Sequence, residues 1–363
     1  MANVKAGVLP KMDVWYLASM SSANSQPEDE YVPSRPVATA DPAAAELVEL
    51  ADSAAGEQPL AADDSFIIRR RRRTMLPLAL FLFTCVSVFW AGAGRFAPHM
   101  YLLADGDLIG ARQTVLANWQ NGLVYMACLL GILFCHEMGH FVATLLYRIP
   151  ASLPYFLPLP ISPIGTLGAV IGMDGLKANR KEIFDIGLAG PLAGLAVAAP
   201  ILWIGIQRLD LTGTPGGGVF AIDLPLLLRL VFYFRPPDGY VPGEGIYQWQ
   251  LNPYFMAGWV GLLITGLNML PVSQLDGGHV LFALFRRRAH ALARWFMVLA
   301  IAFIVFSGLY SWSLMIVLIM LIGTDHPPTR DDNVPLGWFR TALGFASLAI
   351  PILCFPPRVF TEM

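Results

Sequence analysis

Charged residues are scarce in this sequence. Asp, Glu, Lys and Arg make up 14 % of its 363 residues, well below the roughly 25 % of typical soluble domains. Hydrophobic residues make up 56 %, and several apolar runs approach or exceed the ~18 residues needed to cross a hydrocarbon core. This composition excludes an ordinary soluble domain and predicts a polytopic membrane protein.

Cysteine is also scarce, and its spacing excludes a disulfide framework. No pair shows the C-x-x-C spacing, and all four cysteines lie in apolar segments: Cys85, Cys128, Cys135 and Cys354. Cys135 is a conceivable metal ligand because it precedes His136, but a small core residue is the favoured interpretation. Residues 1–20 lack a basic flank followed by an apolar run, so we expect no cleavable signal peptide.

The N-terminal region is polar and acidic. Residues 1–68 contain eleven Asp and Glu against three Lys and Arg, and we expect residues 20–65 to be largely disordered because they hold too little apolar surface to fold. Five arginines, Arg69–Arg73, then precede the first apolar run. Basic clusters beside a span mark the cytoplasmic side, so we expect a cytoplasmic N-terminus and no nucleic-acid binding.

The apolar runs predict an all-α fold of about six transmembrane helices. The expected spans are residues 75–94, 122–147, 184–206, 254–284, 292–323 and 339–355. The run at 292–323 fits one long span or two short ones broken near Ser307–Ser313. Residues 207–253 are expected to form an outer loop in which "LPLLLRLVFYF" is an interfacial helix.

Residues 149–175, "IPASLPYFLPLPISPIGTLGAVIGMDG", are apolar but rich in proline. Proline disfavours a helix, and irregular backbone at membrane depth is tolerated only against protein or water. We therefore expect a re-entrant loop with a β-hairpin, entering from the cytoplasmic side between the second and third spans.

The second span carries the sequence "HEMGH". His136 and His140 are four residues apart and therefore share one face of a helix, which is the spacing for two imidazoles to bind one metal ion. Glu137 lies close enough to reach a water that the metal activates, as in the H-E-x-x-H motif of zinc hydrolases. Ionisable residues inside a membrane are costly and usually functional, so a purely structural polar cluster is disfavoured.

A hydrolytic zinc needs three protein ligands and an open position. Asp276 is the only carboxylate in residues 254–323 and is the favoured third ligand, with His279 as its rival. The predicted spans place Asp276 at a depth similar to that of His136. Asn268 could hydrogen-bond a substrate or a developing oxyanion, or it could join helices.

Four stretches together resemble the site-2 protease family of intramembrane zinc metalloproteases. They are "HEMGH", "IGTLGAVIGM", "AGPLAG" and "NMLPVSQLDGG", and the resemblance covers roughly residues 122–284. The outer loop 207–253 is too short for the PDZ-like domain that some relatives carry. A later stretch, "TDHPPTRDDNVPLG", has no assigned role, and its His326 is a weak alternative ligand expected on the outer side, far from His136.

The resemblance implies a role for each matched residue. His136, His140 and Asp276 would bind one zinc ion, and Glu137 would be the catalytic base. Asn268 would lie at the active site, and the hairpin around 165–172 would guide substrate, with contacts from Gly165, Thr166 and Gly168.

The expected function is therefore hydrolysis of peptide bonds in membrane-spanning proteins, in or near the bilayer. The bilayer is expected to be a bacterial plasma membrane, with an organellar membrane of bacterial descent as the alternative. The alternatives are a metal-ion transporter and an inactive membrane scaffold. The expected organisation is an N-terminal region (1–68), a first helix and outer loop (69–121), a protease core (122–284) and C-terminal helices (285–363).

Overall fold

The structure is a computed structural model. It describes residues 74–103, 108–213, 218, 220–272, 274–309, 312–323, 326–356 and 358–362. The acidic region 1–68 and the arginine cluster Arg69–Arg73 lie outside these residues, so the predictions made for them stay predictions.

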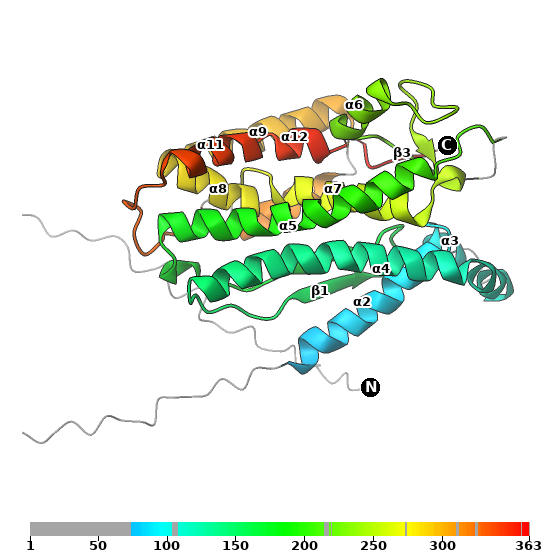
Figure 1. Cartoon of the computed structure of the whole chain (residues 1–363), viewed down its shortest axis with the longest axis horizontal. Helices are drawn as coiled ribbons and strands as arrows, with labels where there is room; N and C mark the ends of the chain where they lie inside the picture. Colours follow the sequence, from blue (N-terminus) through cyan, green and yellow to red (C-terminus); the bar gives the residue numbers. More distant parts are fainter. Residues whose placement is uncertain are drawn as a thin grey trace, which may run out of the picture. The chain divides into compact units, whose positions relative to one another are not determined.

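The described chain is mostly helical, with two small antiparallel sheets (Figure 1). The helices are α2 (Met75–Ala93), α3 (Pro98–Leu103), α4 (Leu108–Leu146), α5 (Arg180–Gln207), α6 (Leu226–Phe234), α7 (Pro253–Asn268), α8 (Asp276–Phe285), α9 (Arg288–Ser307), α10 (Ser313–Ile322), α11 (Trp338–Ser347) and α12 (Ile350–Cys354), with 3₁₀ turns at Gly175–Lys177 and Gln248–Gln250. The strands are β1 (Tyr155–Leu159), β2 (Gly165–Val170), β3 (Phe220–Ile222), β4 (Ile246–Tyr247) and β5 (Phe360–Glu362).

Four helices of the described ranges, α2, α4, α5 and α9, are long and apolar enough to cross a membrane. This confirms the helical membrane fold predicted from composition, while the number of six spans stays a prediction. In the described part of the chain the predicted span at 254–284 is two shorter helices, α7 and α8. The predicted span at 339–355 is likewise two helices, α11 and α12, which residues 348 and 349 separate.

Helices α4 and α5 run side by side (Figure 1). Helix α5 begins after Asn179, whose side chain accepts hydrogen bonds from the backbone of residues 181 and 182, while the Glu182 carboxylate accepts from the Asn179 N–H at 2.8 Å. This capping box fixes where the helix starts. Farther along, a Cβ on Gly139 of α4 would lie 2.5 Å from the carbonyl oxygen of Ala189, so the two backbones approach closely only because position 139 is glycine.

Helix α7 ends at Asn268 and α8 begins at Asp276. Pro271 has no N–H to continue a helix, and a Cβ on Gly277 would lie 2.0 Å from the carbonyl oxygen of Met269. Glycine is therefore required where the chain folds back on itself. As a result Asn268, the last residue of α7, and Asp276, the first of α8, line the same cavity.

Strands β1 and β2 form an antiparallel pair whose register shifts after Leu157. Thr166 bridges this irregularity, since its hydroxyl donates to the Leu157 carbonyl at 2.7 Å and accepts from the Gly168 N–H at 3.0 Å. The pair is held on α2 by the Ser87 hydroxyl, which donates to the Gly165 carbonyl at 2.6 Å. A re-entrant position of this pair in the bilayer stays a prediction.

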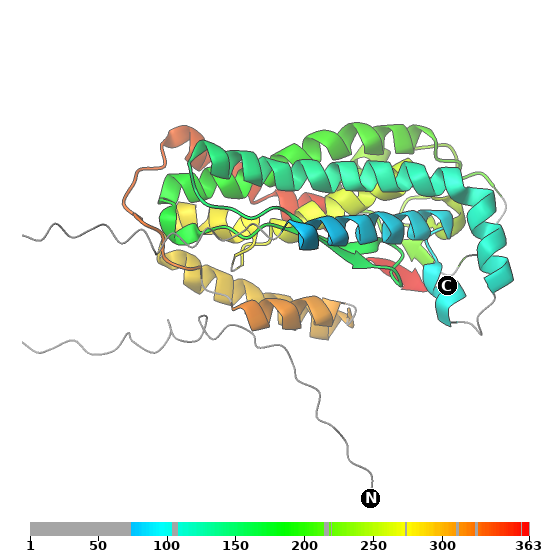
Figure 2. The same ribbon diagram turned by 90° about the horizontal axis from the view of Figure 1, so that it is seen from below.

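The stretch 292–323 consists of two helices, because α9 ends at Gly308 in a left-handed conformation (φ 67°) and α10 begins at residue 313. Figure 2 shows both, in orange, to one side of the other helices. The chain then returns to the end of the molecule where α8 ends and α5 begins: His326 contacts His279, and the Arg330 N–H donates to the Ala178 carbonyl at 2.9 Å. The expectation that His326 lies far from the candidate site is therefore wrong, while the side of the membrane on which it lies stays a prediction.

The core lies between α2, α4, α5 and α7. Its largest fully buried side chains include Tyr125, Phe255 and Trp259. The Trp259 indole donates to the Asp223 carbonyl at 2.9 Å, which satisfies its N–H and ties α7 to the turn after β3.

Candidate metal centre

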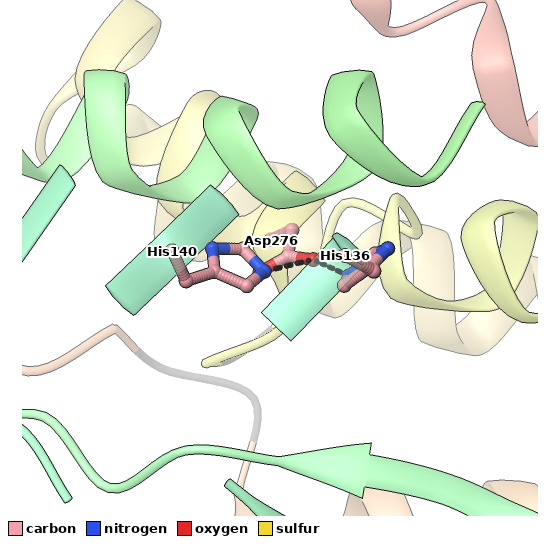
Figure 3. Close-up of side chains that lie close together, drawn as sticks. All are labelled: His136, His140 and Asp276. Carbon is pink, nitrogen blue, oxygen red and sulfur yellow. Dashed lines mark hydrogen bonds and ion pairs between the residues drawn. The ribbon is translucent and has the colours of Figure 1, made fainter. Parts of the chain in front are cut away.

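Three side chains that could bind a metal meet in the interior (Figure 3). His136 and His140 come from one face of α4, and the carboxylate of Asp276 lies between their rings. The Nε2 atoms of both histidines are 3.3 Å from Asp276 Oδ2. His136 and His140 are buried, and the Asp276 side chain is 14 % exposed.

Neighbouring groups determine which nitrogen of each histidine is free to bind. His140 Nδ1 lies 2.8 Å from the carbonyl oxygen of Ile186. A carbonyl only accepts, so Nδ1 carries the proton and Nε2 presents its lone pair toward Asp276. The side-chain amide nitrogen of Asn268 lies 3.1 Å from His136 Nε2. An amide N–H only donates, so Nε2 is the nitrogen of His136 that carries the lone pair, and a metal bound there would replace this hydrogen bond.

The donor set and its spacing fit zinc. Ligand atoms held at about 2.0–2.1 Å in a tetrahedron are about 3.3 Å apart, which is the separation of Asp276 Oδ2 from both imidazole nitrogens. Two imidazoles and one carboxylate leave one position open, as in hydrolytic zinc sites. Among the described residues, this is the one group of three or more such side chains close enough to share an ion, and neither Cys135 nor His279 belongs to it.

A cavity of about 130 Å³ opens beside this group. Glu137, which is 3 % exposed, lines it together with His140 and Asp276. Asn268 and His279 line it as well. A carboxylate, a metal-binding group and an amide donor thus face one space, which is the arrangement that hydrolysis of a peptide bond requires.

The cavity is lined by one end of the hairpin, which is not where the residues named from the sequence lie. Ala169 and Val170, at the end of β2, line the cavity. Gly165, Thr166 and Gly168 are not among its described lining residues; the first two pack within the hairpin and against α2. Their roles in substrate binding stay a prediction.

Two glycines in "AGPLAG" make room for the histidine rings, a role that was not predicted from the sequence. A Cβ on Gly190 would lie 2.0 Å from His140 Nε2, and a Cβ on Gly194 would lie 3.0 Å from His136 Nδ1. The signal was present in the sequence, since the two glycines have the same four-residue spacing as the histidines and both pairs lie on helices. Small residues at this spacing let helices approach closely.

Replacing Gly190 by alanine is expected to displace the His140 ring and abolish stable metal binding. A Cβ at 2.0 Å leaves no space for the ring, and overpacking of this kind costs about 1–3 kcal/mol of stability. Metal content and thermal unfolding of the purified variant test this. Gly131→Ala in α4 is the matched control, because nothing lies within 4 Å of its Cβ; wild-type metal affinity in Gly190→Ala would contradict the prediction.

Together these features define a class of protein: a helical membrane protein with a buried two-histidine, one-carboxylate centre. The sequence pattern of peptidase family M50 matches residues 124–233 and 240–309. The chain belongs to peptidase family M50, which confirms its resemblance to the site-2 proteases.

The chain is also similar to curated plant proteins. It is 31 % identical over 228 residues, 60 % of this chain, to the rice protein named "Probable zinc metalloprotease EGY1, chloroplastic". It is 30 % identical over 237 residues, 63 % of this chain, to the Arabidopsis thaliana protein of the same name. Identity to the Arabidopsis protein named "Probable zinc metalloprotease EGY2, chloroplastic" is 27 % over 288 residues, 75 % of this chain. The aligned parts span 38 %, 41 % and 50 % of these relatives' own lengths.

Proposed function

We propose that this protein is an intramembrane zinc metalloendopeptidase. The observation that carries the proposal is the joint placement of His136, His140 and Asp276 beside a cavity that Glu137 also lines. Membership of a peptidase family and the names of the plant relatives support it.

In this proposal His136 Nε2, His140 Nε2 and a carboxylate oxygen of Asp276 hold one zinc ion. Bound there, the ion would polarise the scissile carbonyl and increase the acidity of water at the open position. The Ile186 carbonyl keeps His140 in the tautomer that binding requires, and the glycines of α5 leave both rings their space.

Glu137 is the general base of the proposed reaction. Its carboxylate takes a proton from the attacking water and later delivers it to the nitrogen of the leaving amine. The side-chain amide of Asn268, within hydrogen-bond reach of His136, can donate to the oxygen on which negative charge develops.

The proposed substrate is a transmembrane segment, locally unwound so that its peptide bonds are accessible. Strand β2 pairs with β1 along one edge, and no described residue pairs with its other edge. Because Ala169 and Val170 of β2 also line the cavity, an extended substrate added to the free edge would lie next to the candidate metal centre.

The membrane proposed for this activity is a bacterial plasma membrane, with the N-terminus cytoplasmic and residues 122–284 as the protease core. The apolar helices support the membrane setting. The three plant relatives described above are all named as chloroplast proteins, so they do not support the bacterial location.

Removal and return of metal test the proposal. The full-length protein, purified in detergent, is expected to cleave a transmembrane peptide, and a chelator is expected to lower the rate by at least about 100-fold, because metal catalysis supplies several kcal/mol. One equivalent of zinc should restore the rate. Cleavage that persists after the metal has been removed would contradict the proposal.

A further inference from the structure

His326 contacts the candidate site from outside the family-matched stretches, which end at residue 309. Its Nε2 lies 2.7 Å from Nδ1 of His279. His279 is three residues beyond Asp276 on α8 and lines the same cavity as Glu137. A segment to which the sequence assigned no role therefore touches the wall of the proposed active site.

The hydrogen bonds of this pair have a defined direction. His326 Nδ1 lies 2.6 Å from the carbonyl oxygen of Pro327, and a carbonyl only accepts, so Nδ1 of His326 carries the proton. In the neutral imidazole Nε2 is then an acceptor, and His279 Nδ1 must donate to it. The remaining nitrogen of His279, Nε2, is left with a lone pair.

The position of His326 is fixed by its surroundings. Its ring stacks on Phe282 of α8, with centroids 4.2 Å apart and planes at 8°, and it is 7 % exposed. The segment that follows is bound to the start of α5, because the Arg180 N–H donates to the Asp331 carbonyl at 3.1 Å. The Arg180 guanidinium in turn donates to the Ala283 carbonyl of α8 at 2.7 Å.

We infer that His326 is a positioning residue for the proposed peptidase: it holds His279 in the tautomer whose Nε2 accepts a hydrogen bond from a backbone N–H of a peptide bound in the cavity. The inference rests on the proposed function for the nature of the bound molecule. The tautomer itself follows from the contacts of the two histidines alone.

Two variants separate the hydrogen bond from packing. His326→Phe keeps a ring for the stack on Phe282 but removes the acceptor, whereas His326→Gln keeps an acceptor and loses the stack. We expect kcat/KM for a transmembrane peptide to fall about tenfold in His326→Phe and to stay within about threefold of wild type in His326→Gln, since a polar group left without its partner costs about 1–3 kcal/mol. Zinc content should be unchanged in both.

A double variant tests whether the effect passes through His279. In a His279→Ala background, His326→Phe is expected to lower kcat/KM no further, because residues that act through one contact are not additive. The inference is overturned if His326→Phe retains wild-type activity, if the two variants at 326 are equally impaired, or if His326→Phe has the same effect in both backgrounds.

The tautomer has a readout that does not depend on proteolysis. In full-length protein labelled with ¹⁵N-histidine, nitrogen chemical shifts should show His279 protonated at Nδ1 and unprotonated at Nε2. The signal of His279 is assigned by its loss in His279→Gln. The Nδ1 preference should disappear in His326→Phe and persist in His326→Gln. If the wild-type protein cleaves no peptide but shows this tautomer pattern, the proposed function fails while the positioning of His279 by His326 stands. If Nδ1 of His279 is unprotonated in the wild-type protein, the positioning itself is overturned.

Discussion

Glu137→Gln is expected to bind zinc as wild type does and to cleave peptide about 100- to 10,000-fold more slowly, the usual contribution of a general base. Glutamine has nearly the same shape but cannot take a proton from water. Glu137 lines the cavity and is not part of the three-ligand group, so metal binding should not change. The measurement pairs metal analysis with single-turnover cleavage of a transmembrane peptide.

This variant also separates the proposed function from its two rivals. A metal transporter has no need of a base beside its ligands, so metal uptake that survives in Glu137→Gln together with an absence of cleavage in wild type would favour transport. An inactive scaffold would show no cleavage in either protein. Undiminished cleavage in Glu137→Gln would mean that another group acts as the base.

Asp276→Ala is expected to lower zinc affinity by more than about 100-fold, since it removes a ligand, and loss of a residue that merely supports a ligand already costs about 10- to 100-fold. The carboxylate is the one negatively charged donor of the group and lies 3.3 Å from both imidazoles. Competition titration with a chromophoric chelator measures the affinity, and cleavage should be lost in parallel.

Asp174→Ala is the matched control for this prediction. Asp174 forms a surface ion pair with Lys177 at 2.9 Å, a kind of contact worth about 0–1 kcal/mol, and it is not part of the candidate site. Zinc affinity should be unchanged in this variant. If Asp276→Ala instead binds zinc with wild-type affinity, another residue must be the third ligand, and His279 is the nearest candidate on the same helix.

Much of the site follows from local spacing. The i, i+4 positions of His136 and His140 determine that both rings leave one face of α4, and this holds wherever the helix packs. The pairing of this face with Asp276 was predicted from the scarcity of charge, because an apolar stretch with one carboxylate leaves few alternatives. The structure brings the three residues together, while their role as ligands stays a prediction.

The features that could not be predicted depend on contacts between distant segments. The space for the His140 ring is set by Gly190 on another helix, and hydropathy does not reveal which face of α5 packs on α4. The place of His326 depends on whether 292–323 crosses once or turns back, and an apolar run of that length is compatible with both. The structure breaks the run at Gly308, and the segment after α10 brings His326 into contact with His279.

X-ray absorption at the zinc edge of the loaded, full-length protein tests the central claim most directly, because it reports the donor atoms themselves. We expect two imidazole nitrogens together with oxygen donors, all at about 2.0–2.2 Å, and no sulfur. Asp276→Ala should lose this spectrum. A zinc–sulfur distance of about 2.3 Å, which would implicate Cys135, or three imidazoles with Asp276 dispensable, would contradict it.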